Sequence, residues 1–299
     1  MRLRTPAESA WATMRDHLVE RLPRVDPARI DAMLREERIV DLHGPIAPDA
    51  PFVPESFLWF HRDLPDEVPV PFEIGVVHRD DDLLVVDKPH FMATIPRGRH
   101  ILETALVRLR RELDLPALSP AHRLDRPTAG LLMFVLRPER RGAYQTLFRD
   151  RRVRKTYEAV ARHDPSLDLP RTVRSRIVKE RGVVRAYEEP GPVNAVTHVE
   201  LLTHRNENGR NGLARYRLVP ETGRTHQLRV HMNGLGLPIL GDSFYPELTD
   251  KPLDDFRRPL QLLASTLEFR DPFHGTLRRF TTRLQLQAWT SYEDWKGRA

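Results

Sequence analysis

The sequence of 299 residues contains no cysteine. This absence excludes disulfide bonds, thiolate zinc sites, iron–sulfur clusters and catalysis by a cysteine nucleophile. It is typical of a cytoplasmic protein, which is the location that we expect. No apolar run approaches the roughly 18–20 residues of a membrane-spanning helix, so we expect no membrane partner.

Lysine is scarce, and arginine supplies 43 of the 48 basic residues. The formal net charge is +6, but residues 1–70 carry −4 and the rest of the chain carries +10. Arginine binds phosphate bidentately and stacks on bases, so the larger part has the charge balance of a protein that binds a polyanion. A high-GC genome that replaces lysine by arginine explains the composition equally well, but not the uneven distribution.

The N-terminal part of the chain has a pattern of its own. Apolar residues at three- and four-residue steps predict a helix over residues 8–22. A second helix is predicted over residues 27–38, with Asp26 as its N-cap. Prolines crowd residues 44–71 and argue against a compact helix or a central strand there.

Two structural units follow from these patterns. We predict a small helical N-terminal unit over residues 1–65, a larger unit over residues 66–299 and a linker near residues 64–72. In the larger unit strands outnumber helices and several follow one another directly, which predicts an α+β fold with a mixed, mainly antiparallel sheet flanked by helices. The predicted strands are 74–78, 82–87, 130–136, 155–161, 194–202, 212–219, 260–269 and 276–284, and the predicted helices are 101–113, 139–150 and 224–234.

The densest basic segment is residues 137–155, with a net charge of +6. We interpret it as a footprint for a phosphate backbone, because it contains few acidic residues that could pair its charges. The alternative is a solvated helix face. Three aromatic residues in or beside the segment can stack on bases or simply pack the helix down; they are Tyr144, Phe148 and Tyr157.

An aspartate lies close to two arginines in the segment His122–Gly130, just before a predicted buried strand. Neighbouring arginines favour the ionised form of a carboxyl group. An oriented, ionised carboxylate can act as a nucleophile or as a base. A structural salt bridge within a turn is the alternative interpretation of the same residues.

A glycine turn leads into a predicted helix in the segment Glu221–His231. Its Thr225, His226 and Gln227 are donors near a positive helix end, which suits an anion or a base edge. His226 and His231 are five residues apart, the wrong step for two metal ligands on one helical face, so we expect no metal. The acidic triplet 80–82 is interpreted as a solvated hairpin turn rather than a cation site.

Taken in series, these segments form one recognisable pattern. It consists of Asp82–Pro89, His122–Leu132, Lys155–Ala159, Thr222–His231 and Pro238–Asp242. The pattern resembles the RluA group of RNA pseudouridine synthases, over about residues 73–285 and with the elements in the expected order. The resemblance implies the pseudouridine synthase fold, with its catalytic cleft.

The resemblance also implies roles for individual residues. Asp125 matches the catalytic aspartate, Tyr157 matches the tyrosine that stacks on the target base and is placed for proton transfer, and Arg229 matches the arginine that pairs with the catalytic carboxylate. Arg123 matches the arginine that holds the place of the displaced nucleotide. The residues expected to bind substrate are His122, Arg123, Arg126, Thr128, Arg149, Arg152, Lys155, Arg224, His226 and Gln227.

The implied activity is the isomerisation of uridine to pseudouridine without a cofactor or a metal. The base–sugar nitrogen bond breaks, the uracil rotates, and it is rejoined through carbon 5. Whether Asp125 attacks the sugar or removes a sugar proton stays open. The expected partner is structured RNA, ribosomal RNA ahead of transfer RNA, and the expected state is a monomer. The alternative is a non-catalytic RNA-binding protein on the same fold. A third hypothesis is an unrelated nucleic-acid hydrolase, and the missing metal-ligand spacings argue against it.

Two features depart from the family pattern. Ala129 stands where the motif usually has serine, which affects a local hydrogen bond and not the mechanism. The N-terminal residues 1–65 resemble a small two-helix RNA-binding module, yet their acidic charge predicts weak binding to RNA. We therefore interpret this unit as a degenerate RNA-binding-like module, with a simple packing module as the alternative.

Overall fold

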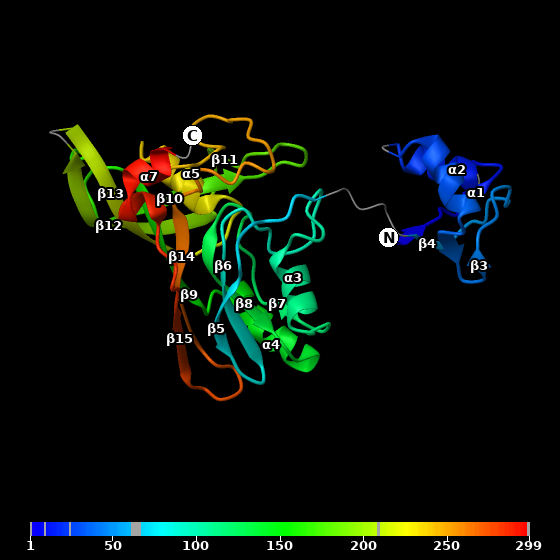
Figure 1. Ribbon diagram of the computed structural model, residues 1–299, viewed down its shortest axis with the longest axis horizontal. Helices are drawn as coiled ribbons and strands as arrows, with labels where there is room; N and C mark the ends of the chain where they lie inside the picture. The colour runs from blue at the N-terminus through cyan, green and yellow to red at the C-terminus, as the bar shows by residue number, and fades with distance from the viewer. Residues whose placement is uncertain (1, 9, 24, 61–66, 208–209, 298–299) are drawn as a thin grey trace. The chain divides into compact units, whose positions relative to one another are not determined.

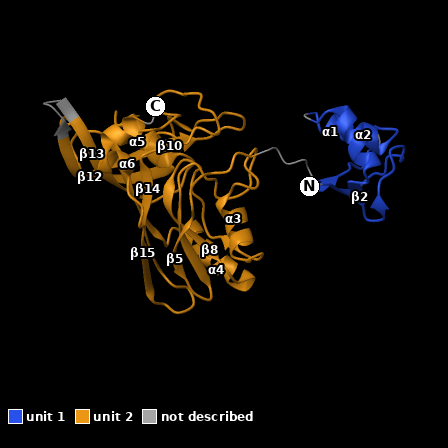
Figure 2. Ribbon diagram, in the orientation of Figure 1, with its two compact units in different colours: residues 1–66 blue, residues 67–299 orange. Residues whose placement is uncertain are grey.

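The computed structural model describes residues 2–8, 10–23, 25–60, 67–207 and 210–297. The chain forms two compact units, residues 1–66 and 67–299 (Figure 2). The boundary predicted at residue 65 and the start of the predicted linker fall on residues 61–66, which lie outside the described residues. No helix in the described part is both long and apolar enough to cross a membrane.

The first unit is a small antiparallel sheet with two helices. Thr13 and Asp16 form a capping box at the start of α1, so this helix begins later than residue 8, where it was predicted. Asp26 accepts a hydrogen bond from the Ala28 amide, which confirms it as the N-cap of the second helix. The elements are β1 (Arg2–Arg4), α1 (Met14–Arg21), α2 (Pro27–Arg35), β2 (Ile39–Asp41), β3 (Gly44–Pro45) and β4 (Phe57–Phe60).

The proline-rich stretch contains a central strand, so our prediction of none there was wrong. The strand order is β1-β4-β2-β3, and β4 therefore pairs on both edges. The flanking prolines, Pro54 and Pro65, leave a proline-free window whose amides can all donate. Leu58 and Phe60 of β4 are buried in one apolar cluster with residues of both helices.

The second unit is built on a sheet of eleven strands, with the order β11-β10-β12-β13-β9-β14-β8-β6-β5 and with β15 and β7 paired to β14 and β8 (Figure 1). Its pairs are antiparallel except β14 with β8, which confirms the mixed, mainly antiparallel α+β fold. The elements are β5 (Gly75–Arg79), β6 (Leu83–Lys88), α3 (Ala105–Glu112), β7 (Ser119–Pro120), β8 (Ala129–Val135), η1 (Pro138–Arg140), α4 (Arg141–Arg149), β9 (Arg154–Arg162), β10 (Arg171–Val178), β11 (Tyr187–Glu189), β12 (Ala195–Glu207), β13 (Arg210–Pro220), α5 (Gln227–Gly234), β14 (Leu262–Arg270), β15 (Leu277–Thr281), α6 (Gln287–Thr290) and α7 (Tyr292–Gly297).

Helix ends differ from the predictions, and five elements of the second unit were not predicted, namely β7, β10, β11, α6 and α7. Helix α3 begins at Ala105, behind the N-cap Thr104, rather than at residue 101. Helix α5 begins at Gln227, because the preceding His226 has a left-handed backbone with φ 57°. Strands β10 and β11 were not predicted, since arginines, serine and glutamates interrupt their apolar alternation.

Strand β14 joins the two halves of the sheet at its centre. Its Ala264 lies opposite Gly130 of β8 on one side and Tyr157 of β9 on the other. Gly130 has φ +106°, and a Cβ there would lie 2.3 Å from the carbonyl oxygen of Ala264. Only glycine therefore allows β8 and β14 to approach so closely, directly behind the segment that contains Asp125.

Candidate active site

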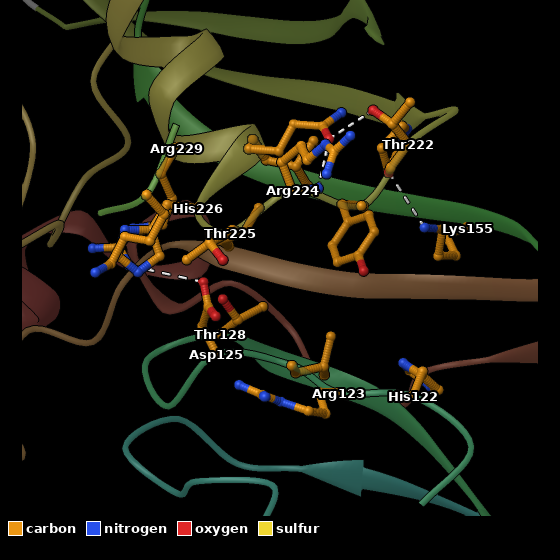
Figure 3. Close-up of a pocket in the computed structure, with 18 of the residues that line it drawn as sticks. His122, Arg123, Asp125, Thr128, Lys155, Thr222, Arg224, Thr225, His226 and Arg229 are labelled. Carbon is orange, nitrogen blue, oxygen red and sulfur yellow. Dashed lines mark hydrogen bonds and ion pairs between the residues drawn. The ribbon is translucent and has the colours of Figure 1, made fainter. Parts of the chain in front are cut away.

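A cleft of about 1080 Å³ opens beside β9 and β14. Its walls come from the loop before β8 and from the loop between β13 and α5. Figure 3 shows Asp125 and Thr128 facing Thr225, His226 and Arg229 across it. The predicted site residues that line the cleft are His122, Arg123, Asp125, Thr128, Lys155, Tyr157, Arg224, His226, Gln227 and Arg229.

The Asp125 loop is held through its backbone. Four successive carbonyl groups, at residues 124–127, each accept a hydrogen bond, and the three side-chain donors all come from residues 88–94. The bonds are Thr94 Oγ1 to Leu124 O (2.8 Å), Thr128 N to Asp125 O (3.1 Å), Lys88 Nζ to Arg126 O (3.4 Å) and His90 Nδ1 to Pro127 O (2.7 Å). This arrangement fixes the main chain and leaves the Asp125 carboxylate 32% exposed toward the cleft.

Lys88 is a buried amine beneath this loop, and the sequence alone did not assign it to the site. It is fully buried, and burial lowers its pKa to about 7 although the charge of Asp125 acts in the opposite direction. Its Nζ also donates to the carbonyl groups of Pro89 and Met92. The signal was present in the segment Asp82–Pro89, which is the first segment of the family pattern.

Arg229 forms the opposite wall, and its main partner is Asp242. The guanidinium donates to both Asp242 oxygens at 2.7 and 2.6 Å, while its nearest nitrogen lies 4.0 Å from Asp125. Burial alone lowers the pKa of Arg229, but the hydrogen bonds and charges of Asp242, together with Asp125, raise it overall. Arg229 is thus a buried, permanent cation that faces the Asp125 carboxylate.

Asp242 is the second residue that the sequence analysis missed. Its side chain is fully buried and also accepts from the backbone amides of Phe244 and Tyr245. The preceding Gly241 has φ +77°, and a Cβ there would lie 2.4 Å from the carbonyl oxygen of Pro259. The dipeptide Gly241-Asp242, already part of the family pattern, was the available signal.

Tyr157 lines the cleft from β9, the strand next to β14. Burial raises its pKa, and the charge of Asp125 raises it further, so the hydroxyl keeps its proton at neutral pH. Two residues earlier, Lys155 Nζ lies 3.5 Å from the carbonyl oxygen of Thr222. This strand thus adds an aromatic face and a cation to the cleft.

The loop that leads into α5 is supported by Gln227. The Gln227 amide donates to Val196 O and Thr197 Oγ1, and its oxygen accepts from Thr222 Oγ1 and the Arg224 amide. These four hydrogen bonds connect the loop to the start of β12. The neighbouring His226 lies against the Tyr245 hydroxyl at 3.1 Å, and burial lowers its pKa to about 4, so its ring is neutral.

Three predicted substrate-binding residues lie elsewhere. Arg126 lines an adjoining cleft of about 550 Å³, which shares Asp125, His226 and Arg229 with the first. Arg149 and Arg152, which are both described and exposed, line neither of these two clefts. The cationic residues that line the main cleft are Arg97, Arg123, Lys155, Lys179, Arg224 and Arg229, and Arg97 and Lys179 were not predicted.

The basic segment 137–155 divides into two parts, which corrects the view that its charges have few partners. Arg137 lies within 3.6 Å of Asp81 and Asp82, and the Arg140 guanidinium stacks on Phe273 at 3.8 Å. These partners come from distant turns, so the local charge count did not show them. In the described part of the chain no ion pair involves residues 151, 152 and 154, which are exposed.

The charges of the cleft suit a polyanion that presents one reactive group to Asp125. Asp125 is the one carboxylate among the lining residues, all of which are described, and six basic residues line the same cleft. The described residues hold no group of three or more histidines, aspartates and glutamates arranged for a metal ion. The acidic triplet is a hairpin turn in which Asp80 accepts from the amides of residues 82 and 83.

Comparisons with known proteins agree with this chemistry. Residues 82–234 match the family model of RNA pseudouridylate synthases. The chain is 33% identical over 211 residues to the dual-specificity RNA pseudouridine synthase RluA of Pasteurella multocida, covering 67% of this chain and 88% of that protein. It is 31% identical over 216 residues to the same enzyme of Yersinia pestis, covering 69% and 96%.

Solved structures show the same fold. Human RNA pseudouridylate synthase domain containing 1 superposes with a TM-score of 0.56 at 24% identity, over 77% of this chain and 96% of that one. Human RNA pseudouridylate synthase domain containing 4 gives a TM-score of 0.55 at 24% identity, over 74% and 93%. Because the family model spans more than half of the chain and the relatives are covered almost completely, the chain belongs to the RNA pseudouridylate synthases and is an RluA-type isomerase that acts on RNA.

Proposed function

We propose that this protein isomerises specific uridines of structured RNA, with Asp125 as the catalytic carboxylate, and that it acts as a cytoplasmic monomer. Ribosomal RNA is the first substrate to test and transfer RNA the second. The observation that carries the proposal is the partly exposed Asp125 carboxylate, which a rigid backbone presents to a cationic cleft.

Binding begins with displacement of the target nucleotide, because a base inside a duplex cannot reach a cleft. The cations around the cleft attract the backbone phosphates. Tyr157 offers an aromatic face on which the uracil can stack. The exposed Arg123 is positioned at the rim, where a guanidinium can occupy the space that the base leaves.

The chemical step is a rearrangement within one nucleotide. The bond between N1 and the sugar breaks, a bond from carbon 5 to the sugar forms, the hydrogen on carbon 5 leaves as a proton, and N1 gains a proton. Asp125 acts either by attack on the sugar carbon or by removal of a sugar proton. Both roles use the carboxylate as the reacting group, and the Arg229 guanidinium lies 4.0 Å from it across the cleft.

Tyr157 suits the proton transfers because it stays protonated near neutral pH. Its raised pKa makes it a donor rather than an anion beside Asp125. The reaction is redox-neutral and transfers no group from a second molecule. The proposal therefore requires no cofactor.

The direct test uses Asp125→Asn, which keeps the shape of the side chain and removes its charge. We expect pseudouridine formation to be abolished while RNA affinity stays within about tenfold, because the cations of the cleft remain. Release of tritium from RNA with tritiated uridine carbon 5 measures the reaction. Asp81→Asn is the matched control, since the Asp81 side chain is 90% exposed in a hairpin turn.

Two outcomes contradict the proposal. Undiminished product from Asp125→Asn overturns the catalytic assignment. Absence of product from the unaltered protein, on every RNA that it binds, favours the non-catalytic RNA-binding protein instead. Pseudouridine mapping of total RNA from a deletion strain and its parent identifies the substrate, and the missing sites must return with the unaltered gene but not with Asp125→Asn.

A further inference from the structure

The sheet of the first unit has one covered face and one open face. Leu58 and Phe60 point to the covered face, where they share an apolar cluster with Met14, Leu18 and Ile30 of the two helices. Side chains alternate along a strand, so the residues between them point the other way. These residues are Phe57 and Trp59, and both are partly exposed.

Two arginines lie beside these aromatic residues on the neighbouring strand. In the antiparallel register, Arg2 lies opposite Trp59 and Arg4 lies opposite Phe57. The Arg2 guanidinium stacks 4.0 Å from the centre of the Phe57 ring, and the two aromatic rings are 6.1 Å apart. We name this group of four residues the aromatic face; it is a layer of alternating cations and rings.

The charges of the helical side are arranged differently. There, Arg15 pairs with Asp31, and Arg29 and Arg38 both lie near Glu36. On the aromatic face, Arg4 reaches Glu55, and both of these side chains are more than half exposed. Within the described residues Arg2 has no ion-pair partner. Among the described residues, the aromatic face therefore keeps one arginine, Arg2, whose charge no ion pair neutralises.

We infer that the aromatic face binds unpaired bases of the RNA substrate, at nucleotides outside the cleft. Stacking on an aromatic side chain accepts any base, and arginine can stack on a base and bind the adjoining phosphate. Four-stranded sheets that expose aromatic residues on one face are an established platform for single-stranded RNA. The inference rests on the proposed function only for the identity of the polymer.

The test maps RNA contacts on the full-length protein. The probe is a single-stranded RNA of about 12 nucleotides that contains 4-thiouridine, a length within the usual footprint of such surfaces. Irradiation and peptide mapping are expected to identify crosslinks at Phe57 or Trp59 as well as in the cleft. Crosslinks confined to residues 67–299 overturn the inference, and they are also the outcome expected if this face instead covers another protein surface.

A charge reversal at Arg2 tests RNA binding independently and leaves both aromatic residues unchanged. Arg2→Glu is expected to weaken binding of the probe at least about fivefold, because a stacked guanidinium is replaced by an anion. Arg21→Glu, at the exposed end of α1, is the matched control with the same change of charge. Equal weakening by both variants contradicts a specific surface and indicates a general charge effect.

Turnover separates this inference from the proposed function. Arg2→Glu is expected to leave the single-turnover rate of pseudouridine formation at saturating RNA unchanged within about twofold, since it alters binding and not the chemical step. Crosslinks at Phe57 or Trp59 without any product from the unaltered protein would refute the proposed function and keep the surface. Product without these crosslinks would refute the RNA-binding role of the aromatic face and keep the proposed function.

Discussion

The two walls of the cleft are held in place in different ways. The Asp125 wall is fixed through four backbone carbonyl groups, so its carboxylate makes few contacts of its own. The Arg229 wall is fixed through side chains, because Asp242 binds the guanidinium on two sides. The difference shows that a partly exposed carboxylate can be kept free of partners by fixing its backbone, whereas a buried guanidinium is kept charged by a buried carboxylate.

The largest effect is expected from removing that partner. Asp242→Ala leaves the Arg229 guanidinium, whose side chain is 2% exposed, buried without its counter-charge. We expect a loss of about 3–5 kcal/mol in the free energy of unfolding, together with loss of activity. Urea unfolding measures the first quantity. Asp255→Ala is the control, because its partner Arg257 is exposed and such pairs contribute little; a similar loss in both variants would contradict the comparison.

The Arg229 wall is also expected to be sensitive to acid through His231. This ring is fully buried between Ser175 and Thr197, with Glu188 3.9 Å away, and burial lowers its pKa to about 4. Between pH 4 and 6.5 the unfolded chain binds the proton more strongly, so stability increases with pH in that window and is lost on acidification. The difference is at most about 3 kcal/mol.

His231→Gln tests this dependence. The variant keeps a polar side chain but does not titrate, so the free energy of unfolding should change less between pH 4 and 6.5 than in the unaltered protein. Urea unfolding at a series of pH values gives the two slopes. Equal slopes would show that other buried histidines, on either wall, dominate the acid response.

The backbone support of the other wall is tested by Thr94→Val. Its hydroxyl bonds both the carbonyl and the amide of Leu124, and valine has the same shape without the hydroxyl. We expect a loss of about 1–3 kcal/mol from the unpaired backbone groups. If the loop positions Asp125, kcat should decrease more than KM increases. A change in KM alone would mean that the loop serves binding only.

The smallest effect on stability is expected outside both walls. Arg149→Ala with Arg152→Ala should lower RNA affinity and reduce the salt slope of binding by about 0.7–0.9 for each phosphate that the variant no longer neutralises. Stability should not change, because both residues are exposed. Arg137→Ala is the control, since it pairs with Asp81 and Asp82. An unchanged slope in the double variant would place the RNA elsewhere.

Motif order predicted which residues share the cleft, because each motif is a continuous segment whose spacing is preserved in the chain. Asp125, Tyr157 and Arg229 were found in this way. Contacts that form only after folding were not predicted. Asp242 and Lys88 lie within the matched segments, but the sequence does not show that they contact Arg229 and the Asp125 loop. A sequence pattern records neighbours along the chain, whereas a buried ion pair depends on neighbours in space.

The fold was predicted where alternation or apolar runs were strong, as in β8. Strand β10 was missed, because charged side chains occupy both of its faces in the sequence pattern and its pairing with β11 and β12 overrides them. The proline-rich segment led to the wrong prediction that it contains no central strand. The high proline content of residues 44–71 as a whole conceals the four proline-free residues of β4.

The place of β14 has a consequence for how the enzyme is made. β8 and β9 are not paired with each other; β14 lies between them and follows β9 by about 100 residues. At the usual rate of synthesis, β9 therefore leaves the ribosome roughly 5–20 s before the strand that will join it to β8. The distance between Asp125 and Tyr157 is thus set late, because a chain that ends before β14 contains both residues but not the strand that lies between β8 and β9.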